Sequence, residues 1–347
     1  MKNLYSSEPT ENVSLQVEFS PVWEVILGIA GYTHTRLRHT FELDETWKVQ
    51  QKSMPSALTK NLKAIEQTNF WYGLIMLQNQ FSALSISDFL VCLSEISTTQ
   101  FYEVLLPYSS RHDEPLRKAA AAQYENMGLF EEYAACFEGH DYLAAYTRHL
   151  SQYSFQEIGE LFRHVLTGWH EWMSRQEEWD KWMQALAFEQ KQSCLLDKEK
   201  PIEEMKRITD GVNYIPEPSI WTVKFIPHVS YRPWILEQRT PDTKLFFYPL
   251  KEEALLEPGV PPNALVRGHK ALGDELRLKL LYELFKGPLS LQEMSRQFHI
   301  SKTTLHHQLS ILKSAKLIRV EKGIYSANLS QVRDFSGQLA DYLGMDR

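Results

Sequence analysis

The sequence predicts a mainly α protein of the α+β class, in which a large, mostly helical N-terminal body with a small β-sheet precedes a smaller C-terminal domain. Apolar residues recur at three- and four-residue steps through most of the chain, as on a buried helix face, and only a few short runs have the alternation or the β-branched and aromatic content of strands. Residues 257–263 hold three prolines, which is typical of a stiff linker. We therefore predict two domains, 1–264 and 265–347.

Within the body, strands and helices are predicted from different signals. Alternation or β-branched and aromatic runs predict short strands, which we expect to pair in one sheet, at residues 14–19, 221–226, 234–238 and 243–248. Ser20 followed by Pro21 predicts the start of a helix that ends near residue 32. Apolar periodicity predicts further helices at residues 55–67, at 87–97 with Ser87 as the cap, and in succession through 115–199.

Four tryptophans occur within fourteen residues of the helical stretch: Trp169, Trp172, Trp179 and Trp182. One interpretation is an aromatic pocket in the body that binds an apolar or cationic small-molecule effector through ring faces. The other interpretation is a packing face between helices or an interface between subunits, which the helical spacing favours.

The C-terminal domain opens with a leucine-rich helix face. Leu272, Leu276, Leu280, Leu281 and Leu284 follow helical spacing, and we predict one helix for them. We expect Gly287 to end this helix in the left-handed conformation, and Pro288 cannot continue it. A second helix follows at once, because Ser290 and Glu293 fit the S-x-x-E capping box.

A third helix is predicted after the turn at residues 299–301, with Ser301 as its N-cap and its end near residue 315. Leu305, Leu309 and Leu312 lie on its inner face. The opposite face is polar and carries no acidic residue: Thr303, His306, His307 and Ser310, with Lys302 and Lys313 beside them. Residues 317–320 and 324–329 then predict a hairpin around 321–323, and residues 330–343 a closing helix.

Two helices in tight succession, the second with a polar outer face, form the arrangement that places side chains against base edges in the major groove of double-stranded DNA. A small helical core with a solvated face is the alternative interpretation. The order of helix, turn, helix, hairpin and closing helix favours a winged helix-turn-helix.

Three segments carry a resemblance to a known family. ALGDELR at residues 271–277, SKTTLHHQLSIL at 301–312 and AKLI at 315–318 resemble the opening helix, the recognition helix and the exit into the wing of the arsenic-repressor (ArsR-type) regulators. The resemblance covers about 75 residues and agrees at several positions in a fixed order. A long helical body before such a domain also resembles the layout of the large members of this family.

The resemblance implies a transcriptional regulator that represses by occluding a promoter. We expect a homodimer whose two recognition helices read the half-sites of an inverted repeat. The candidate residues for base contact are Lys302, Thr303, His306, His307 and Ser310. The candidates for positioning on the DNA backbone are Thr304, Gln308, Lys313, Arg277, Arg319, Lys322 and Tyr325.

The domain departs from the metal-sensing members of this family. Ser290 and Gln292 stand where those members carry a C-x-C pair, and no histidine follows His307. Soft metals need thiolate or imidazole ligands, so we expect neither a metal site nor a cofactor. Any effector would therefore be a non-metal molecule bound by the body.

Charge and composition agree with a DNA-reading tail on a body that does not touch DNA. The net charge is −7, but residues 268–347 hold 12 basic and 8 acidic residues, so this segment alone carries a charge of +4. The N-terminus lacks an apolar signal core and no apolar run is long enough to span a bilayer, which predicts a cytoplasmic protein without a membrane partner. The three cysteines are widely spaced and predict free thiols.

The body shows no motif for chemistry. It contains no G-x-G-x-x-G, no G-x-x-x-x-G-K-[ST] and no G-x-S-x-G, so we expect no enzyme activity. Two alternatives stay open. The winged helix can serve as a protein-interaction module, or the body can be an uncharacterised enzyme with a regulatory DNA-binding tail.

Overall fold

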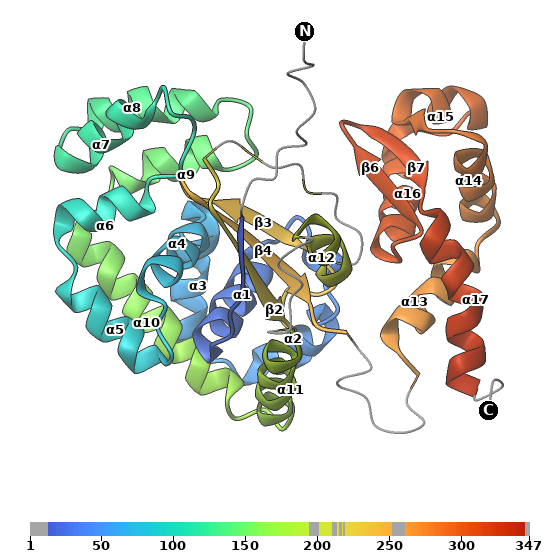
Figure 1. Cartoon of the computed structure of the whole chain (residues 1–347), viewed down its shortest axis with the longest axis horizontal. Helices are drawn as coiled ribbons and strands as arrows, with labels where there is room; N and C mark the ends of the chain where they lie inside the picture. The colour runs from blue at the N-terminus through green and yellow to red at the C-terminus, as the bar shows by residue number, and fades with distance from the viewer. Residues whose placement is uncertain are drawn as a thin grey trace, which may run out of the picture. The chain divides into compact units, whose positions relative to one another are not determined.

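The computed structural model describes residues 13–193, 201–209, 214, 217, 219–251 and 261–343. The chain divides into two compact units, Met1–Leu250 and Lys251–Arg347 (Figure 1). Most of the predicted linker at residues 257–263 lies outside the described residues, as does Cys194. Cys92 and Cys136 are free thiols.

Helices make up most of the first unit, as the sequence predicts. They are α1 (Pro21–Thr33), α2 (Asp44–Gln50), α3 (Ser56–Thr68), α4 (Trp71–Phe81), α5 (Ile86–Glu95), α6 (Thr98–Leu105), α7 (Glu114–Ala122), α8 (Met127–Ala134), α9 (Leu143–Leu150), α10 (Phe155–Met173), α11 (Glu178–Ser193) and α12 (Pro201–Ile208). The cap of α5 is Ser85, whose hydroxyl accepts a hydrogen bond from the Asp88 N–H at 3.1 Å. The prediction of Ser87 as this cap was therefore wrong by two residues.

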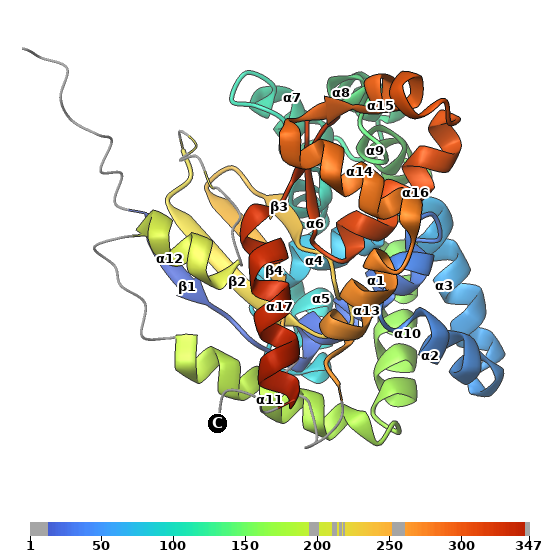
Figure 2. The ribbon, with the colours of Figure 1, turned by 90° about the vertical axis from the view of Figure 1, so that its right-hand side faces the viewer.

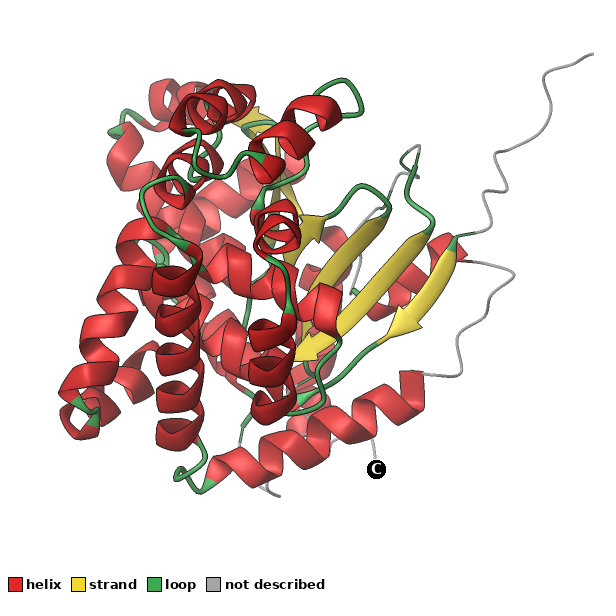
Figure 3. Ribbon diagram, turned by 90° about the vertical axis from the view of Figure 1, so that its left-hand side faces the viewer, coloured by secondary structure: helices red, strands yellow, loops and turns green. Residues whose placement is uncertain are grey.

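The predicted strands of the body pair in one sheet. They are β1 (Ser14–Val17), β2 (Thr222–His228), β3 (Leu236–Arg239) and β4 (Thr243–Pro249), and among the described residues they form a four-stranded sheet in the order β1-β2-β4-β3. β1, β2 and β4 run parallel, and β3 pairs antiparallel with β4 as an edge strand. Figure 3 shows the four strands side by side, with the bulk of the helices next to them.

The two faces of this sheet are buried against different helices, because successive strand residues point to opposite sides. Phe225 and Phe246 stack with a centroid distance of 5.8 Å in a cluster that includes Met205 of α12. Phe247 faces the other way and meets Trp23 of α1 edge to face at 5.3 Å. The sheet is therefore covered on both faces, which explains why β2 and β4 are apolar along most of their length.

Buried polar groups hold the end of β2 against α1. The carboxylate of Glu24 accepts hydrogen bonds from the backbone N–H of Val229 at 3.0 Å and of Ser230 at 2.7 Å. His228 is fully buried beside this contact. Burial, and then the charge of Arg232, lowers the pKa of the His228 imidazole to about 3, so the ring stays neutral in the folded protein at neutral pH.

We expect the stability of the first unit to fall as the pH drops below about 6.5, the ordinary pKa of histidine. The unfolded chain binds a proton on His228 in this range and the folded chain does not, so the loss reaches at most about 1.4 kcal/mol per pH unit. Urea unfolding followed by tryptophan fluorescence measures it, since all nine tryptophans precede residue 251. His228→Phe should have a shallower dependence between pH 6.5 and 4. The control variant His164→Gln, at an exposed site, should keep the pH dependence of the wild type. Equal slopes of unfolding free energy against pH for all three proteins would contradict the assignment to His228.

The second unit contains the predicted three-helix core, hairpin and closing helix. Its elements are α13 (Asn263–Leu272), α14 (Glu275–Lys286), β5 (Leu289–Ser290), α15 (Leu291–Phe298), α16 (Lys302–Ser314), β6 (Ile318–Glu321), β7 (Ile324–Ala327) and α17 (Leu329–Leu343). Among the described residues the hairpin β6–β7 gains a third strand, β5, which the sequence interpretation missed. In Figures 1 and 2, α13 and α17 lie at the end of this unit away from α15.

Two details of the predicted opening helix were wrong. The leucines do not lie on one helix, because α13 ends at Leu272 and α14 begins at Glu275, with Asp274 capping the N–H of Arg277 at 3.0 Å. Gly287 ends α14 in an extended conformation with φ 169°, not in the left-handed one. Leu280, Leu281 and Leu284 are nevertheless buried together with Met294, Leu305, Leu309 and Leu312 in one core.

Candidate functional site

The turn between α15 and α16 is fixed by local hydrogen bonds. Ser290 and Glu293 form the predicted capping box at the start of α15. His299 ends α15 in the left-handed conformation with φ 56°, and the Ser295 hydroxyl donates to the Ile300 carbonyl at 2.7 Å. Ser301 then caps α16 by accepting from the Thr304 N–H at 3.2 Å. These contacts set the angle between the two helices and leave little freedom to the turn.

The outer face of α16 presents polar side chains to solvent. Leu305, Leu309 and Leu312 are buried, as predicted. On the other sides of the helix the structure places Lys302, Thr303, Thr304, His306, His307 and Lys313 as exposed residues and Gln308 and Ser310 as half-buried ones. Ser310 donates its hydroxyl to the His307 carbonyl at 2.7 Å, and the Thr304 hydroxyl bonds that of Ser301 at 2.8 Å. No acidic residue occurs between Lys302 and Ser314.

The guanidinium of Arg277 makes its hydrogen bonds within the domain. It donates to the carbonyls of Ala271 at 2.7 Å and Lys270 at 2.9 Å, and to Gln308 Oε1 at 2.8 Å. The two carbonyls belong to the last turn of α13, where helix geometry leaves them without intrahelical partners. Arg277 and Gln308 therefore join the end of α13 to α16, and the structure does not bring Arg277 to the outer face with Thr303 and His307.

The wing is a tight hairpin with one cation at its tip. Lys322 and Gly323 have φ values of 49° and 79°, as a two-residue turn of type I′ requires. Lys322 is exposed, whereas Arg319 and Tyr325 are half-buried on the strands. The Tyr325 ring packs against the core of the unit, and this burial raises the pKa of its hydroxyl above the usual value.

Comparison with known proteins agrees with this geometry. Residues 274–320 match the family "Bacterial regulatory protein, arsR family". These residues form an ArsR-type helix-turn-helix domain. No curated protein and no solved structure matches the chain.

The ArsR-type match runs from the Asp274 cap through α14, α15 and α16 to the first wing strand, and it confirms the predicted helix-turn-helix of the C-terminal unit. Domains of this type bind DNA. Helix α13, strand β7, helix α17 and the whole first unit lie outside the matched residues.

The ArsR-type domain uses Ser290 as a helix cap and exposes Gln292, the two positions at which metal-sensing members carry cysteines. Across the part of the chain that the structure describes, no group of three or more His, Cys, Asp or Glu side chains is placed to hold a metal ion. Nor does any helix among those residues have the length and apolar character needed to cross a bilayer.

The four clustered tryptophans of the first unit are packed in its interior. Trp169 is fully buried, and its ring meets Tyr32, Trp47 and Trp172 edge to face at centroid distances of 5.2 to 6.2 Å. Trp172, Trp179 and Trp182 are each at least nine-tenths buried. A pocket of this unit, between α4, α6 and the β3–β4 turn, is lined by none of the four.

Proposed function

We propose that this protein is a sequence-specific transcriptional regulator, a cytoplasmic repressor whose C-terminal unit reads DNA and whose N-terminal body binds a non-metal effector without catalysing a reaction. The observation that carries the proposal is the exposed, acid-free outer face of α16 within an ArsR-type domain. Side chains on such a face can donate and accept hydrogen bonds at base edges without repelling the phosphates.

The proposed base contacts are Lys302, Thr303, His306, His307 and Ser310. Lys313 and Thr304 at the flanks of α16, and Lys322 and Arg319 of the wing, are proposed to contact the DNA backbone, with Tyr325 supporting the wing. For Arg277 and Gln308 we propose a structural role, because Arg277 donates hydrogen bonds both to the end of α13 and to Gln308 and so holds α16 in place.

Two copies of the chain are proposed to bind an inverted repeat, because one recognition helix covers only one half-site. Helix α17 is a candidate surface for the second copy, and its first and last residues, Leu329 and Leu343, are 49% and 57% exposed.

The test is fluorescence anisotropy of the full chain on the intergenic DNA upstream of its own gene, at two salt concentrations and with an unrelated duplex as control. A regulator should bind the upstream DNA at least about 1,000-fold more tightly than the control, with an affinity that falls as salt rises. Equal, weak binding to both duplexes, together with failure to select any sequence from genomic fragments, would count against sequence-specific regulation.

A further inference from the structure

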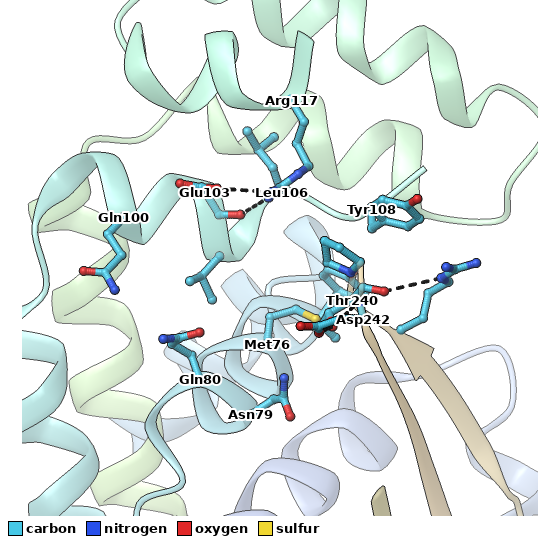
Figure 4. A pocket seen from close by; sticks show the side chains of 14 residues that line it. Met76, Asn79, Gln80, Gln100, Glu103, Leu106, Tyr108, Arg117, Thr240 and Asp242 are labelled. Carbon is cyan, nitrogen blue, oxygen red and sulfur yellow. Dashed lines mark hydrogen bonds and ion pairs between the residues drawn. The ribbon is translucent and has the colours of Figure 1, made fainter. Parts of the chain in front are cut away.

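A pocket of about 350 Å³ opens in the first unit between three helices and a strand turn. Its walls come from α4, α6, the middle of α7 and the turn at residues 240–242 that joins β3 to β4. Figure 4 shows Asn79 and Gln80 on one side of it and Glu103 with Arg117 on the other, with Met76 between them. The pocket has the size and the mixed lining of a small-molecule site.

The two cations of this pocket already have anionic partners. Arg117 pairs with Glu114 at 2.7 Å and with Glu103 at 3.3 Å, and its side chain is 7% exposed. Arg239 pairs with Glu217 at 2.6 Å, and its guanidinium stacks over the Tyr108 ring at 4.6 Å. Neither guanidinium therefore offers an unopposed positive charge to a ligand, and an anion would gain little from them.

The two carboxylates of the lining are less well neutralised. Glu103 shares Arg117 with Glu114, which lies closer to the guanidinium. Asp242 accepts hydrogen bonds from the hydroxyls of Thr240 and Thr243 at 3.0 Å each, and the ion pairs among the described residues include none to Asp242. Lys244 shares Glu217 with Arg239 at 3.1 Å, and the lining together with its ion-pair partners keeps a small excess of negative charge, which favours a positively charged ligand.

The inner wall is apolar and buried. Tyr72, Met76 and Leu106 are 2%, 4% and 2% exposed, and all three line the pocket. Burial raises the pKa of the Tyr72 hydroxyl well above its usual value, so this phenol carries no charge at neutral pH. An alkyl or aryl group of a ligand can pack against these side chains without leaving a charge unpaired.

We propose that this pocket binds a small primary amine with an apolar body, its ammonium attracted by the carboxylates of Glu103 and Asp242 and its body against Met76 and Tyr72, and that it is the effector site of the regulator. The effector role rests on the function proposed above, whereas amine binding in the pocket does not. The cluster of tryptophans, by contrast, is filled by its own packing.

The test is thermal melting of the full chain with three amines, phenethylamine, tyramine and hexylamine, and with three acids of matching body, 3-phenylpropionate, 4-hydroxyphenylacetate and hexanoate. We expect millimolar amines to raise the melting temperature and the acids to leave it unchanged. The assignment of the site would be overturned if the acids raised the melting temperature as much as the amines do. It would also be overturned if none of the three amines raised it.

Two variants connect the effect to the pocket. Glu103→Gln/Asp242→Asn removes both carboxylates at nearly constant size and should weaken amine binding, measured by calorimetry, by about 10-fold or more. Asp242→Asn alone is included because Asp242 is exposed and its replacement does not disturb Arg117; it should weaken binding in the same direction. Glu160→Gln, an exposed glutamate on α10, is the matched control and should bind as the wild type does. Wild-type affinity in both pocket variants would refute the assignment.

The effector role has a separate readout. Operator affinity is measured with and without the amine that binds best, and a change of at least about 5-fold is expected for an allosteric effector. Unchanged operator affinity despite pocket binding would overturn the effector role alone. Absence of any operator binding would refute the proposed function, while the melting result would still decide the site.

Discussion

Replacing Thr303 and His307 by alanine is expected to lower the affinity for the operator by about 10- to 100-fold while leaving that for an unrelated duplex unchanged. The two exposed side chains lie one helical turn apart at the centre of the outer face of α16. Neither adds a fixed charge, so the loss should appear as lost sequence preference and the slope of log affinity against log salt should stay the same. Anisotropy titrations at several salt concentrations measure both quantities.

Lys302→Ala provides the contrast within the same helix. It removes an exposed ammonium from the first turn of α16, so it should weaken binding to every duplex by a similar factor and lower the salt slope by about one. Lys279→Ala on α14 removes an equal charge that is paired with Glu275 at 2.6 Å, and it should change neither quantity. A double Thr303/His307 variant that keeps full operator affinity and specificity would show that α16 does not read the bases.

The elements around α16 were predictable because their signals are local. Ser290 with Glu293 and Ser301 with Thr304 satisfy backbone N–H groups within four residues of sequence, and such caps form wherever the helix does. The hairpin turn at Lys322 and Gly323 is equally local. The break at Gly273 had a local signal too, because Asp274 before a leucine-rich helix is a typical N-cap. The continuous spacing of the leucines across the break predicted a single helix instead.

The roles of Arg277 and of the tryptophans were not predictable in the same way. Whether Arg277 meets phosphate or Gln308 depends on how α13, α14 and α16 pack, and the spacing of residues contains no information on that. The helical spacing of the tryptophans favoured a packing face, but the wall of a pocket can have the same spacing, so only the contacts in the structure decide between the two. The pocket of the first unit brings together residues between Tyr72 and Asp242 from separate elements, so no sequence window contains it.

Trp169→Ala is expected to destabilise the first unit by about 3–5 kcal/mol, the cost of deleting a large, fully buried aromatic side chain. The neighbouring backbone and rings cannot move far enough to fill the cavity that the indole would leave. A Cβ atom placed on Gly28 of α1 would come within 2.7 Å of Trp169 Nε1, so helix and ring are already in close contact. This loss is a large share of the roughly 5–15 kcal/mol by which a typical protein is stable. Urea unfolding followed by the remaining tryptophans measures it.

Two further variants separate packing from ligand contact. Trp221→Ala removes the same side chain from a site that is 66% exposed and should cost less than about 1 kcal/mol. Trp169→Phe should cost less than Trp169→Ala, because the ring fills part of the cavity and the buried indole N–H has no acceptor among the described residues to lose. If Trp169 instead formed the wall of an effector pocket, alanine there would leave the unfolding free energy close to that of the wild type and abolish effector binding. The edge-to-face contacts with Tyr32, Trp47 and Trp172 predict the opposite: a less stable unit in which the pocket between α4, α6 and the β3–β4 turn still takes its ligand wherever the unit remains folded.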